Sequence, residues 1–557
     1  MPRIRLVSLV AVAVLALPVA SRSAHAQRAL GIGEDASTLP AGVVRVTAGV
    51  AWDRANERYD ADGKLRALGA GASATSWNGR YDARLAAAGP LVSTLSGLSG
   101  FDASLGALSI ARRDASVDAP LGLDVGVWSR LTVGVRFRVA NHAIEPNVSI
   151  NPGRIEGTMG FNPAWSISAA HDRNALLLTQ FDSAAAQTSR RIVQCQASPA
   201  TTGCAPLLAN VSGAQSLVAS ASAFAVALNK LYGGRAGGSG LPFVPVGNSA
   251  AEKAIVQRVL GFRDQFAAFG NSSIGTVGPA GSATFSPTDV DRLLTDSLYG
   301  YRLRPLRAVH AYSPGEVAAH LKLRLFQTIG DDTTTIRGFA VRQSAGVSMR
   351  LYGGAAPSVD EAFAPTTGEG TNGIGAQSFT DLWFGSRYSA SVVVGFTQSQ
   401  AQEFAMRLPG ADAPAVGGVP FALMMADREV TLSRTPGSRL DVTVTPRVSL
   451  ARNIWLGGSW GWSQQAADSW RVTAASATMT TASADATTWA AGTNWSEQRL
   501  SLGGTYSTVD AARAGHARYA FDVTYQYQQT SVGSGWRVPK VTRDVVSVRW
   551  YPRLWGR

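Results

Sequence analysis

Charge, cysteine and catalytic motifs are all scarce in this chain. Only 16% of its 557 residues are charged, and its two cysteines are Cys195 and Cys204. It contains no H-E-x-x-H motif and no glycine-rich phosphate-binding loop that ends in Lys. The histidines beyond residue 26 lack metal-ligand spacing; they are His142, His171, His310, His320 and His516. We therefore expect no cofactor, no metal and no enzymatic activity.

Long apolar runs are also absent after the N-terminus. No later segment is continuously apolar over the ~18–20 residues that a membrane helix needs. Without such a helix, a chain can span a membrane only as a closed barrel, because barrel strands pair all backbone polar groups with one another.

The N-terminus itself predicts export. Arg3 and Arg5 precede an apolar stretch from Leu6 to Ala20, and Ala24-His25-Ala26 fits a small-x-small cleavage site. The apolar stretch is too short, with these flanks, to serve as a membrane span. We predict a signal peptide over residues 1–26, cleavage after Ala26, and a bacterial-type outer-membrane location.

What the chain has in abundance is strands that alternate apolar and polar residues. In residues 439–463, Leu440 and Val442 fall on one face and Asp441 on the other, and the alternation resumes after an Arg452–Asn453 turn. Successive strand residues lie on opposite faces, so this pattern predicts a hairpin with one apolar and one polar face. Residues 121–139 repeat the pattern around a second tight turn.

Residues 151–312 interrupt this pattern and are far longer than an ordinary loop. Their composition is helical at 172–190, 207–232 and 251–269, and Ser286-Pro287-Thr288-Asp289 is a typical helix start. Cys195 and Cys204 lie here, and in an oxidising compartment we expect them to form a disulfide. The predicted organisation is a signal peptide (1–26), N-terminal barrel strands (27–150), a helical extracellular insertion (151–312) and C-terminal barrel strands (313–557).

Connections between the strands alternate in length from residue 119 onward. The short ones are Ser129–Arg130, Thr328–Thr333, Ser386–Arg387, Arg452–Asn453 and 508–515, and the long ones are 151–312, 353–376, 407–438, 468–485 and 530–540. Bacterial barrels place short turns in the periplasm and long loops outside the cell.

These ten connections join eleven strands, and three candidate strands before residue 119 bring the count to about 14, within a range of 12–16. Residues 76–104 fit poorly, because they form a long connection on the short-turn side. Residues 27–42 are polar and turn-like, and we expect them at the barrel mouth. We predict an all-β transmembrane antiparallel β-barrel with a large, mainly α-helical extracellular insertion.

Three motifs carry a family resemblance. Gly315–Leu325 begins a strand with Gly, an acid and apolar residues, Thr367-Gly368-Glu369-Gly370 forms a loop, and an aromatic run from Pro539 to Trp555 closes the chain. These motifs resemble outer-membrane barrels of the phenol meta-pathway degradation family, a relative of the long-chain fatty-acid transporters. The acid expected after the loop is missing, and Gly556 and Arg557 displace the terminal aromatic. The resemblance implies transport of hydrophobic compounds across the outer membrane.

The polar strand faces predict the lining of the lumen. Candidate residues for the lumen and its constriction are Arg136, Arg138, Glu316, His320, Lys322, Arg324, Asp441, Arg447 and Asp522. Their basic excess favours anions or carboxylate head groups. The alternative is that these charges pair with one another and stiffen the wall.

Three functions from different classes remain open. The first is a passive channel for hydrophobic or amphipathic small molecules. The second is a structural or surface-interaction barrel with an extracellular cap, and the third is an outer-membrane hydrolase, which needs a Ser or Asp partner for His320. The expected partners are outer-membrane lipid, barrel-assembly machinery and a hydrophobic small-molecule solute. The formal net charge of +13, or +10 without Arg3, Arg5 and Arg22, suits anionic lipid, and no nucleic acid is expected.

Overall fold

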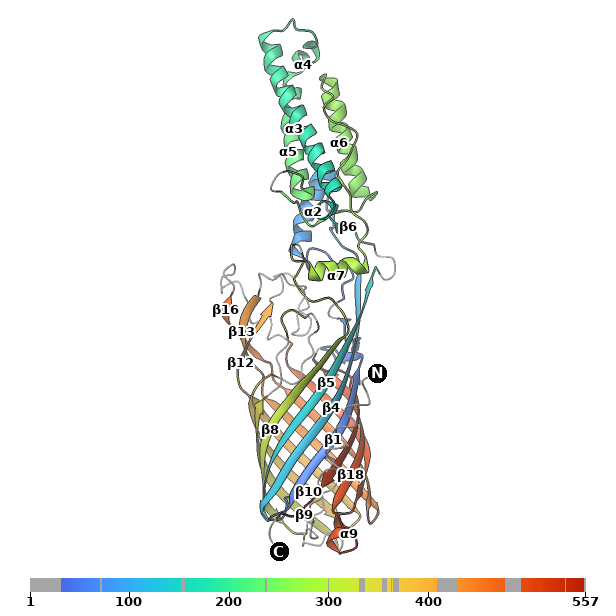
Figure 1. Ribbon diagram of the computed structural model, residues 1–557, viewed down its shortest axis with the longest axis vertical. Helices are drawn as coiled ribbons and strands as arrows, with labels where there is room; N and C mark the ends of the chain where they lie inside the picture. Colours follow the sequence, from blue (N-terminus) through green and yellow to red (C-terminus); the bar gives the residue numbers. More distant parts are fainter. Residues whose placement is uncertain are drawn as a thin grey trace.

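The molecule is a closed antiparallel β-barrel with a tower of helices rising from one end (Figure 1). The computed structural model describes residues 32–70, 73–151, 156–235, 238–298, 300–329, 336–352, 358–361, 363, 370–407, 429–475, 492–535 and 537–554. The predicted signal peptide over 1–26 and most of the Thr367–Gly370 motif lie outside these residues.

Twelve strands form the barrel. They are β1 (Val44–Ala55), β4 (Leu108–Trp128), β5 (Leu131–Ile150), β8 (Val309–Gln327), β9 (Phe339–Tyr352), β10 (Gly373–Phe384), β11 (Tyr388–Ser399), β14 (Arg439–Ala451), β15 (Ile454–Gln465), β17 (Trp495–Ser507), β18 (Phe521–Ser534) and β19 (Thr542–Trp550). Each strand pairs with the next in this series, and β1 pairs with β19 in the register Val46 to Trp550, which closes the barrel.

The predicted count of about 14 strands is therefore too high, although 12 is the lower end of the expected range. The eleven strands expected from residue 119 onward are present. The candidate at Leu105–Ala111 is instead the first part of the 21-residue β4, whose Arg112-Arg113-Asp114 run hides its continuity. The candidate at 65–75 supplies only β3 (Leu65–Ala67), which pairs with β2 (Glu57–Tyr59) outside the barrel.

This correction also resolves the poor fit of residues 76–104. With a single barrel strand before β4, the connection that contains them lies at the tower end rather than at the short-turn end. It includes α2 (Ala83–Ser96), which Asp82 caps by accepting a hydrogen bond from the Arg84 backbone N–H.

The two faces of the barrel wall differ sharply in polarity. Outward-facing Leu323, Val347 and Leu502 are 41%, 54% and 71% exposed, whereas the intervening Asp124, Lys322 and Arg447 are buried inside. The alternating residues of 439–463 thus form part of a barrel wall whose outer face is apolar and whose lumen face is charged.

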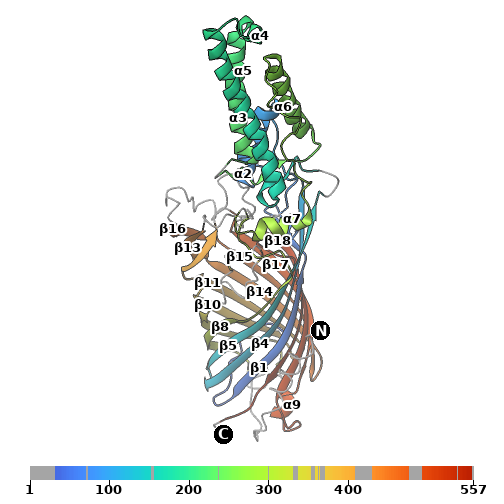
Figure 2. The same cartoon turned by 45° about the horizontal axis from the view of Figure 1, so that its top comes forward.

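Figure 2 shows the tower helices running beside one another above the barrel. They pack around a hydrophobic core that also includes Leu108 and Ile110 at the tower end of β4. The elements of the tower are β6 (Met159–Phe161), the 3₁₀ helix η3 (Pro163–Trp165), α3 (Ser168–Ala197), α4 (Ala205–Ala209), α5 (Val211–Tyr232), β7 (Phe243–Pro245), α6 (Ala250–Ala268) and α7 (Pro287–Thr295), with α2 packed at its base. Phe181, Phe224 and Phe262 stack in its centre with ring centroids 5.1–5.6 Å apart. Ser286 and Asp289 form the capping box that begins α7.

A disulfide at the tip and two polar contacts at the base fix the ends of the tower. Cys195 and Cys204 form a disulfide that ties α3 to α4 at its tip. At its base, the Tyr301 hydroxyl donates to Asp82 at 2.5 Å, and Arg84 pairs with the same carboxylate at 2.6 Å. Burial and the neighbouring Asp82 charge raise the pKa of Tyr301 well above its usual value, so the hydroxyl keeps its proton and remains a donor.

Among the described helices, α5 alone has the length and apolar composition of a membrane span. The expectation that no later segment is apolar enough is therefore wrong for this helix. Its Leu217, Phe224 and Leu228 are buried against the other tower helices, which accounts for its composition.

Smaller elements complete the two ends of the barrel. At the tower end, β12 (Gln402–Arg407), β13 (Glu429–Thr435) and β16 (Ser469–Ala475) form a separate three-stranded sheet. At the opposite end, the short helix α9 (Val509–Arg513) lies between β17 and β18.

Candidate functional site

The most distinctive feature of the lumen is that residues 32–42, here called the lumen segment, lie inside it near the short-turn end. The Arg136 guanidinium on β5 pairs with Glu34 at 2.8 Å. The Lys322 ammonium on β8 donates to the Asp35 carbonyl at 2.8 Å and lies 3.6 Å from the Glu34 carboxylate. The sequence predicts residues 27–42 at the barrel mouth; their described part, residues 32–42, lies inside the lumen, and residues 27–31 lie outside the described residues.

Other strands hold the same segment from the far side. Arg447 on β14 donates through Nε to the Ile32 carbonyl at 2.8 Å, and Ser344 on β9 donates to the Ala36 carbonyl at 2.5 Å. Near β4 and β5, the Leu39 backbone N–H donates to the Thr132 hydroxyl at 2.7 Å. Contacts from strands around the barrel show that the segment crosses the lumen rather than lining one wall.

A buried ion pair anchors the centre of the lumen segment. Asp381 on β10 accepts from Arg342 on β9 at 2.6 and 2.9 Å, from the Ala36 backbone N–H at 3.0 Å and from the Ser391 hydroxyl at 2.6 Å. Neither charged side chain has more than 2% exposure. Several donors share this carboxylate, so its desolvation is well compensated.

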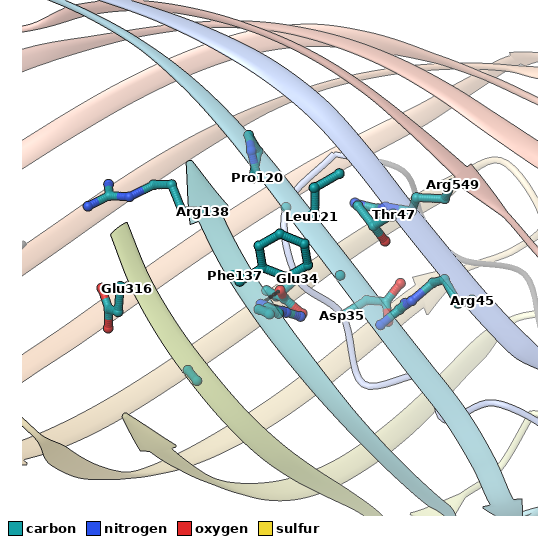
Figure 3. Close-up of a pocket in the computed structure, with 14 residues that line it drawn as sticks. Glu34, Asp35, Arg45, Thr47, Pro120, Leu121, Phe137, Arg138, Glu316 and Arg549 are labelled. Carbon is teal, nitrogen blue, oxygen red and sulfur yellow. Dashed lines mark ion pairs between the residues drawn. The ribbon is translucent and has the colours of Figure 1, made fainter. Parts of the chain in front are cut away.

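Beside the lumen segment lies a cavity of about 380 Å³ (Figure 3). Its lining is Gly33, Glu34, Asp35, Arg45, Thr47, Pro120, Leu121, Gly122, Arg136, Phe137, Arg138, Glu316, Ala318 and Arg549. The lining therefore contributes four guanidinium groups and three carboxylates. Figure 3 shows Glu34 and Asp35 of the lumen segment between β1, which carries Arg45, and β8, which carries Glu316.

Most of these charges already have partners in the wall. Arg45 pairs with Asp124 at 2.7 Å, Arg138 lies 3.5 Å from Asp118, and Glu316 pairs with Arg350 on the adjacent strand. Arg549 on β19 lies opposite Asp522 in the register of β18 and β19, and it points toward the cavity beside Thr47. With four guanidinium groups against three carboxylates, the cavity lining carries a net positive charge.

The structure brings four of the predicted lumen residues to the lumen segment or next to it. Arg136, Lys322 and Arg447 contact the segment directly. His320 lies behind them, with its Nε2 atom 2.7 Å from Asp124. Arg138 and Glu316 line the cavity one layer further toward the tower.

The remaining three predicted residues lie apart from this group. Arg324 contacts Gln327 at the short-turn end, and Asp441 pairs with Arg439 toward the tower end. Asp522 accepts from the Tyr551 hydroxyl at 2.6 Å near the end of the chain. Of these three contacts, only that of Asp441 with Arg439 joins opposite charges within the wall.

Sequence reasoning missed Glu34, Arg342, Asp381 and Arg549 as site residues. Arg342, Asp381 and Arg549 occupy inward positions of alternating strands, so the same periodicity that selected Lys322 could have found them. Glu34 lies in a segment without secondary structure, and only the fold places it among the arginines.

His320 has the Asp partner that hydrolase chemistry could use, in Asp124, but no nucleophile joins this pair among the described residues. In the described part of the chain, no serine hydroxyl hydrogen-bonds to His320. The His320 ring contacts the Asp124 carboxylate, and its backbone pairs with β9. Gly457–Gly461 has the letters of a G-x-S-x-G motif, but it lies within β15 rather than at a strand-to-helix turn. The Ser459 hydroxyl bonds to Ser501 at 2.5 Å instead of to a base.

A closed antiparallel barrel with an apolar outer face and a charged interior is the architecture of outer-membrane barrels. No family model matches the chain, and no curated protein matches it. One similar solved structure is an outer-membrane channel from Pseudomonas putida F1, with 7% identity over 93% of this chain and 98% of the other and a TM-score of 0.39. A second is the toluene transporter TodX of P. putida, with 9% identity over 97% of this chain and 100% of the other and a TM-score of 0.24. A third is the translocator domain of the autotransporter NalP from Neisseria meningitidis, with 7% identity over 91% of this chain and 88% of the other and a TM-score of 0.26.

At such low identity and TM-score, these similarities assign neither a family nor a substrate to this chain.

Proposed function

We propose that this protein is an outer-membrane channel through which hydrophobic or amphipathic small molecules pass passively. The observation that carries the proposal is a charged cavity next to a lumen segment, inside a barrel whose outer face is apolar. The outer face suits lipid, and the interior suits a solute with a polar end.

The proposal includes an orientation and a domain plan. The short turns face the periplasm and the tower projects from the cell, as loop lengths in bacterial barrels indicate. The predicted signal peptide (1–26), the N-terminal strands (27–150), the extracellular insertion (151–312) and the C-terminal strands (313–557) complete the plan.

Charge on the cavity wall favours amphipathic anions over fully apolar solutes. An apolar solute would have to cover guanidinium and carboxylate groups without replacing their hydration, which is costly. A solute with an anionic head instead meets Arg549, which makes no ion pair within 4 Å of a described carboxylate although Asp522 lies on the paired strand. A guanidinium binds such oxyanions with two parallel hydrogen bonds.

The test is efflux from sealed vesicles that contain the purified protein. Benzenesulfonate and benzyltrimethylammonium are matched aromatic solutes with permanent opposite charges, so neither crosses lipid readily without a channel. We expect faster efflux of benzenesulfonate, and we expect Arg549→Gln to reduce this preference severalfold.

Arg190→Gln is the matched control, because Arg190 is exposed on α3 outside the barrel and loses the same charge. It should leave the efflux ratio unchanged. Equal efflux of both solutes, or none above protein-free vesicles, would contradict the proposal.

A second candidate function has its own observation. The tower helices bury their apolar residues in their own core, including Leu217, Phe224 and Leu231. This favours a self-contained cap over a groove that collects solutes, and a cap of this size offers a surface for a partner. A barrel that inserts into vesicles without passing solutes would favour this structural or surface-interaction role.

A further inference from the structure

Four turns at the end of the barrel opposite the tower each present an arginine. Arg130 lies between β4 and β5, Arg387 between β10 and β11, Arg452 between β14 and β15, and Arg518 between β17 and β18. All four side chains are exposed. Because these strand pairs are distributed around the closed barrel, the arginines form a ring at its rim.

Few acidic residues accompany these four arginines in the described turns. The described residues of these four turns contain one carboxylate, Asp510. Arg130, Arg387 and Arg518 make no ion pair with any described residue, and Arg518 lies over the Tyr519 ring at 5.3 Å. The β8–β9 connection carries Asp331 and Asp332 as well as Arg337, so we leave it out of the ring.

Exposed aromatic side chains mark the same level of the barrel. They lie at the strand ends that meet these turns and the β8–β9 connection at the same end of the barrel, and they are Trp128, Phe326, Phe339, Phe384, Tyr388, Tyr506 and Tyr519. Such a belt sits at the lipid–water interface of membrane barrels. Arg387 directly precedes Tyr388, and Arg518 directly precedes Tyr519, so these guanidinium groups lie at the depth of lipid head groups.

We propose that the four turn arginines bind the phosphate groups of anionic phospholipids in the leaflet that faces the short turns. Guanidinium groups form paired hydrogen bonds with phosphate oxygens, and the aromatic belt holds them at the right depth. The tower-end rim differs, because Asp468 there pairs with Arg434 at 2.8 Å and with Arg537 at 2.6 Å. The inference rests on the membrane placement in the proposed function, but it needs no solute to pass.

Lipid retention by the full-length mature protein tests this directly. The purified protein is incubated in detergent with phosphatidylglycerol or phosphatidylethanolamine, and bound lipid is counted by native mass spectrometry. We expect the wild-type protein to retain phosphatidylglycerol in preference to phosphatidylethanolamine. In a variant with Gln at positions 130, 387, 452 and 518, the affinity for phosphatidylglycerol should fall roughly fivefold for each arginine lost. A Lys variant at the same positions should keep part of the preference, since it retains charge without the paired geometry.

The control replaces Arg54, Arg113, Arg190 and Arg307 with Gln, which removes the same charge from exposed sites at the tower end. It should retain wild-type binding. If the fourfold variant misfolds, the double variant Arg387→Gln/Arg518→Gln gives the same readout.

Equal loss in the control, or no preference in the wild type, would overturn the inference. Displacement of the lipid by millimolar inorganic phosphate would also overturn it, because the site would then recognise free phosphate. A protein that fails to insert into vesicles at all would count against the proposed function, whereas an inserted protein without lipid preference counts only against the arginine ring.

Discussion

Gly134 on β5 faces the lumen at a point where any side chain would collide with its neighbours. A Cβ atom there would lie 2.1 Å from Asp124 Oδ1 and 2.6 Å from His320 Cε1. Asp124 cannot move freely, because it is buried and held by Arg45. The close approach of these strands therefore depends on the absence of a side chain.

Gly134→Ala should accordingly destabilise the barrel, by roughly 1–3 kcal/mol as overpacking usually does. The measurement is the temperature at which the folded band disappears in a heat-modifiability gel. Gly461→Ala is the control, because its nearest neighbour would be Thr443 Oγ1 at 3.7 Å, an ordinary contact. Equal transition temperatures for the two variants would refute this account of Gly134.

A second prediction at the residue scale concerns Asp381 on β10. Asp381→Asn removes the charge that compensates the buried Arg342 and weakens the contact to the Ala36 backbone. Breaking one partner of a buried pair costs about 3–5 kcal/mol. We expect a lower urea midpoint and faster proteolysis within residues 32–42.

Asp264→Asn on α6 is the matched control, because its pair with Arg263 is exposed. Exposed pairs contribute little, so its midpoint should stay near that of the wild type. A wild-type midpoint for Asp381→Asn would show that the buried pair does not hold the lumen segment.

Inward residues were predictable from the sequence where strand alternation is regular. Lys322 and Arg447 were identified in this way, and the structure places both on the lumen segment. Their partners on that segment were not predictable, because residues 32–42 have no periodicity and make their contacts across the lumen. The inward face is visible in a sequence, whereas long-range pairing depends on closure of the whole barrel.

At the scale of elements, Asp468 joins three parts of the tower-end rim. It accepts from Arg434 on β13 at 2.8 Å, from Arg537 before β19 at 2.6 Å and from Gln465 at the end of β15 at 3.2 Å. Burial raises the pKa of Asp468, but Arg537 and Arg434 outweigh this, and the net pKa lies below its ordinary value.

A lowered pKa in the folded state stabilises the rim at any pH above the ordinary pKa of a carboxyl group, about 4. That stability is lost as the pH falls through the pKa that Asp468 has in the folded protein. We expect hydrogen exchange in β13 and β16 to be slow at pH 7 and to accelerate in acid relative to the barrel strands. Asp468→Asn should show fast exchange already at pH 7, and an unchanged exchange rate in this variant would contradict the assignment.

The elements themselves were largely predictable. The apolar spacing and cap of α7, the helical composition of α3, α5 and α6 and the eleven strands from residue 119 all appear in the structure. The strand count failed where alternation is weak, because β4 carries charges in its first half and β2 and β3 are too short to reach the barrel.

At the scale of the whole molecule, barrel and tower are joined through adjacent strands. Ile144 on β5 pairs with Val309 on β8, so the two ends of the tower connection leave the barrel side by side. The tower core reaches down to Leu108 and Ile110 at the tower end of β4, but the barrel closes through the pairing of β1 with β19, which does not involve the tower.

Replacing residues 151–306 with a short Gly/Ser linker should therefore leave a barrel that is still heat-modifiable. If the tower is a cap, benzenesulfonate efflux should persist at the wild-type rate or above. A folded barrel whose efflux falls severalfold would instead support a tower that collects solutes for delivery to the lumen.

The most direct measurement of the central claim is benzenesulfonate efflux with and without residues 27–38, which include most of the lumen segment. The account predicts that their removal raises the efflux rate severalfold while benzenesulfonate still leaves faster than benzyltrimethylammonium, because the wall arginines remain. An efflux rate equal to that of protein-free vesicles in both forms, with the barrel folded, would contradict the claim that this lumen is a path for solutes.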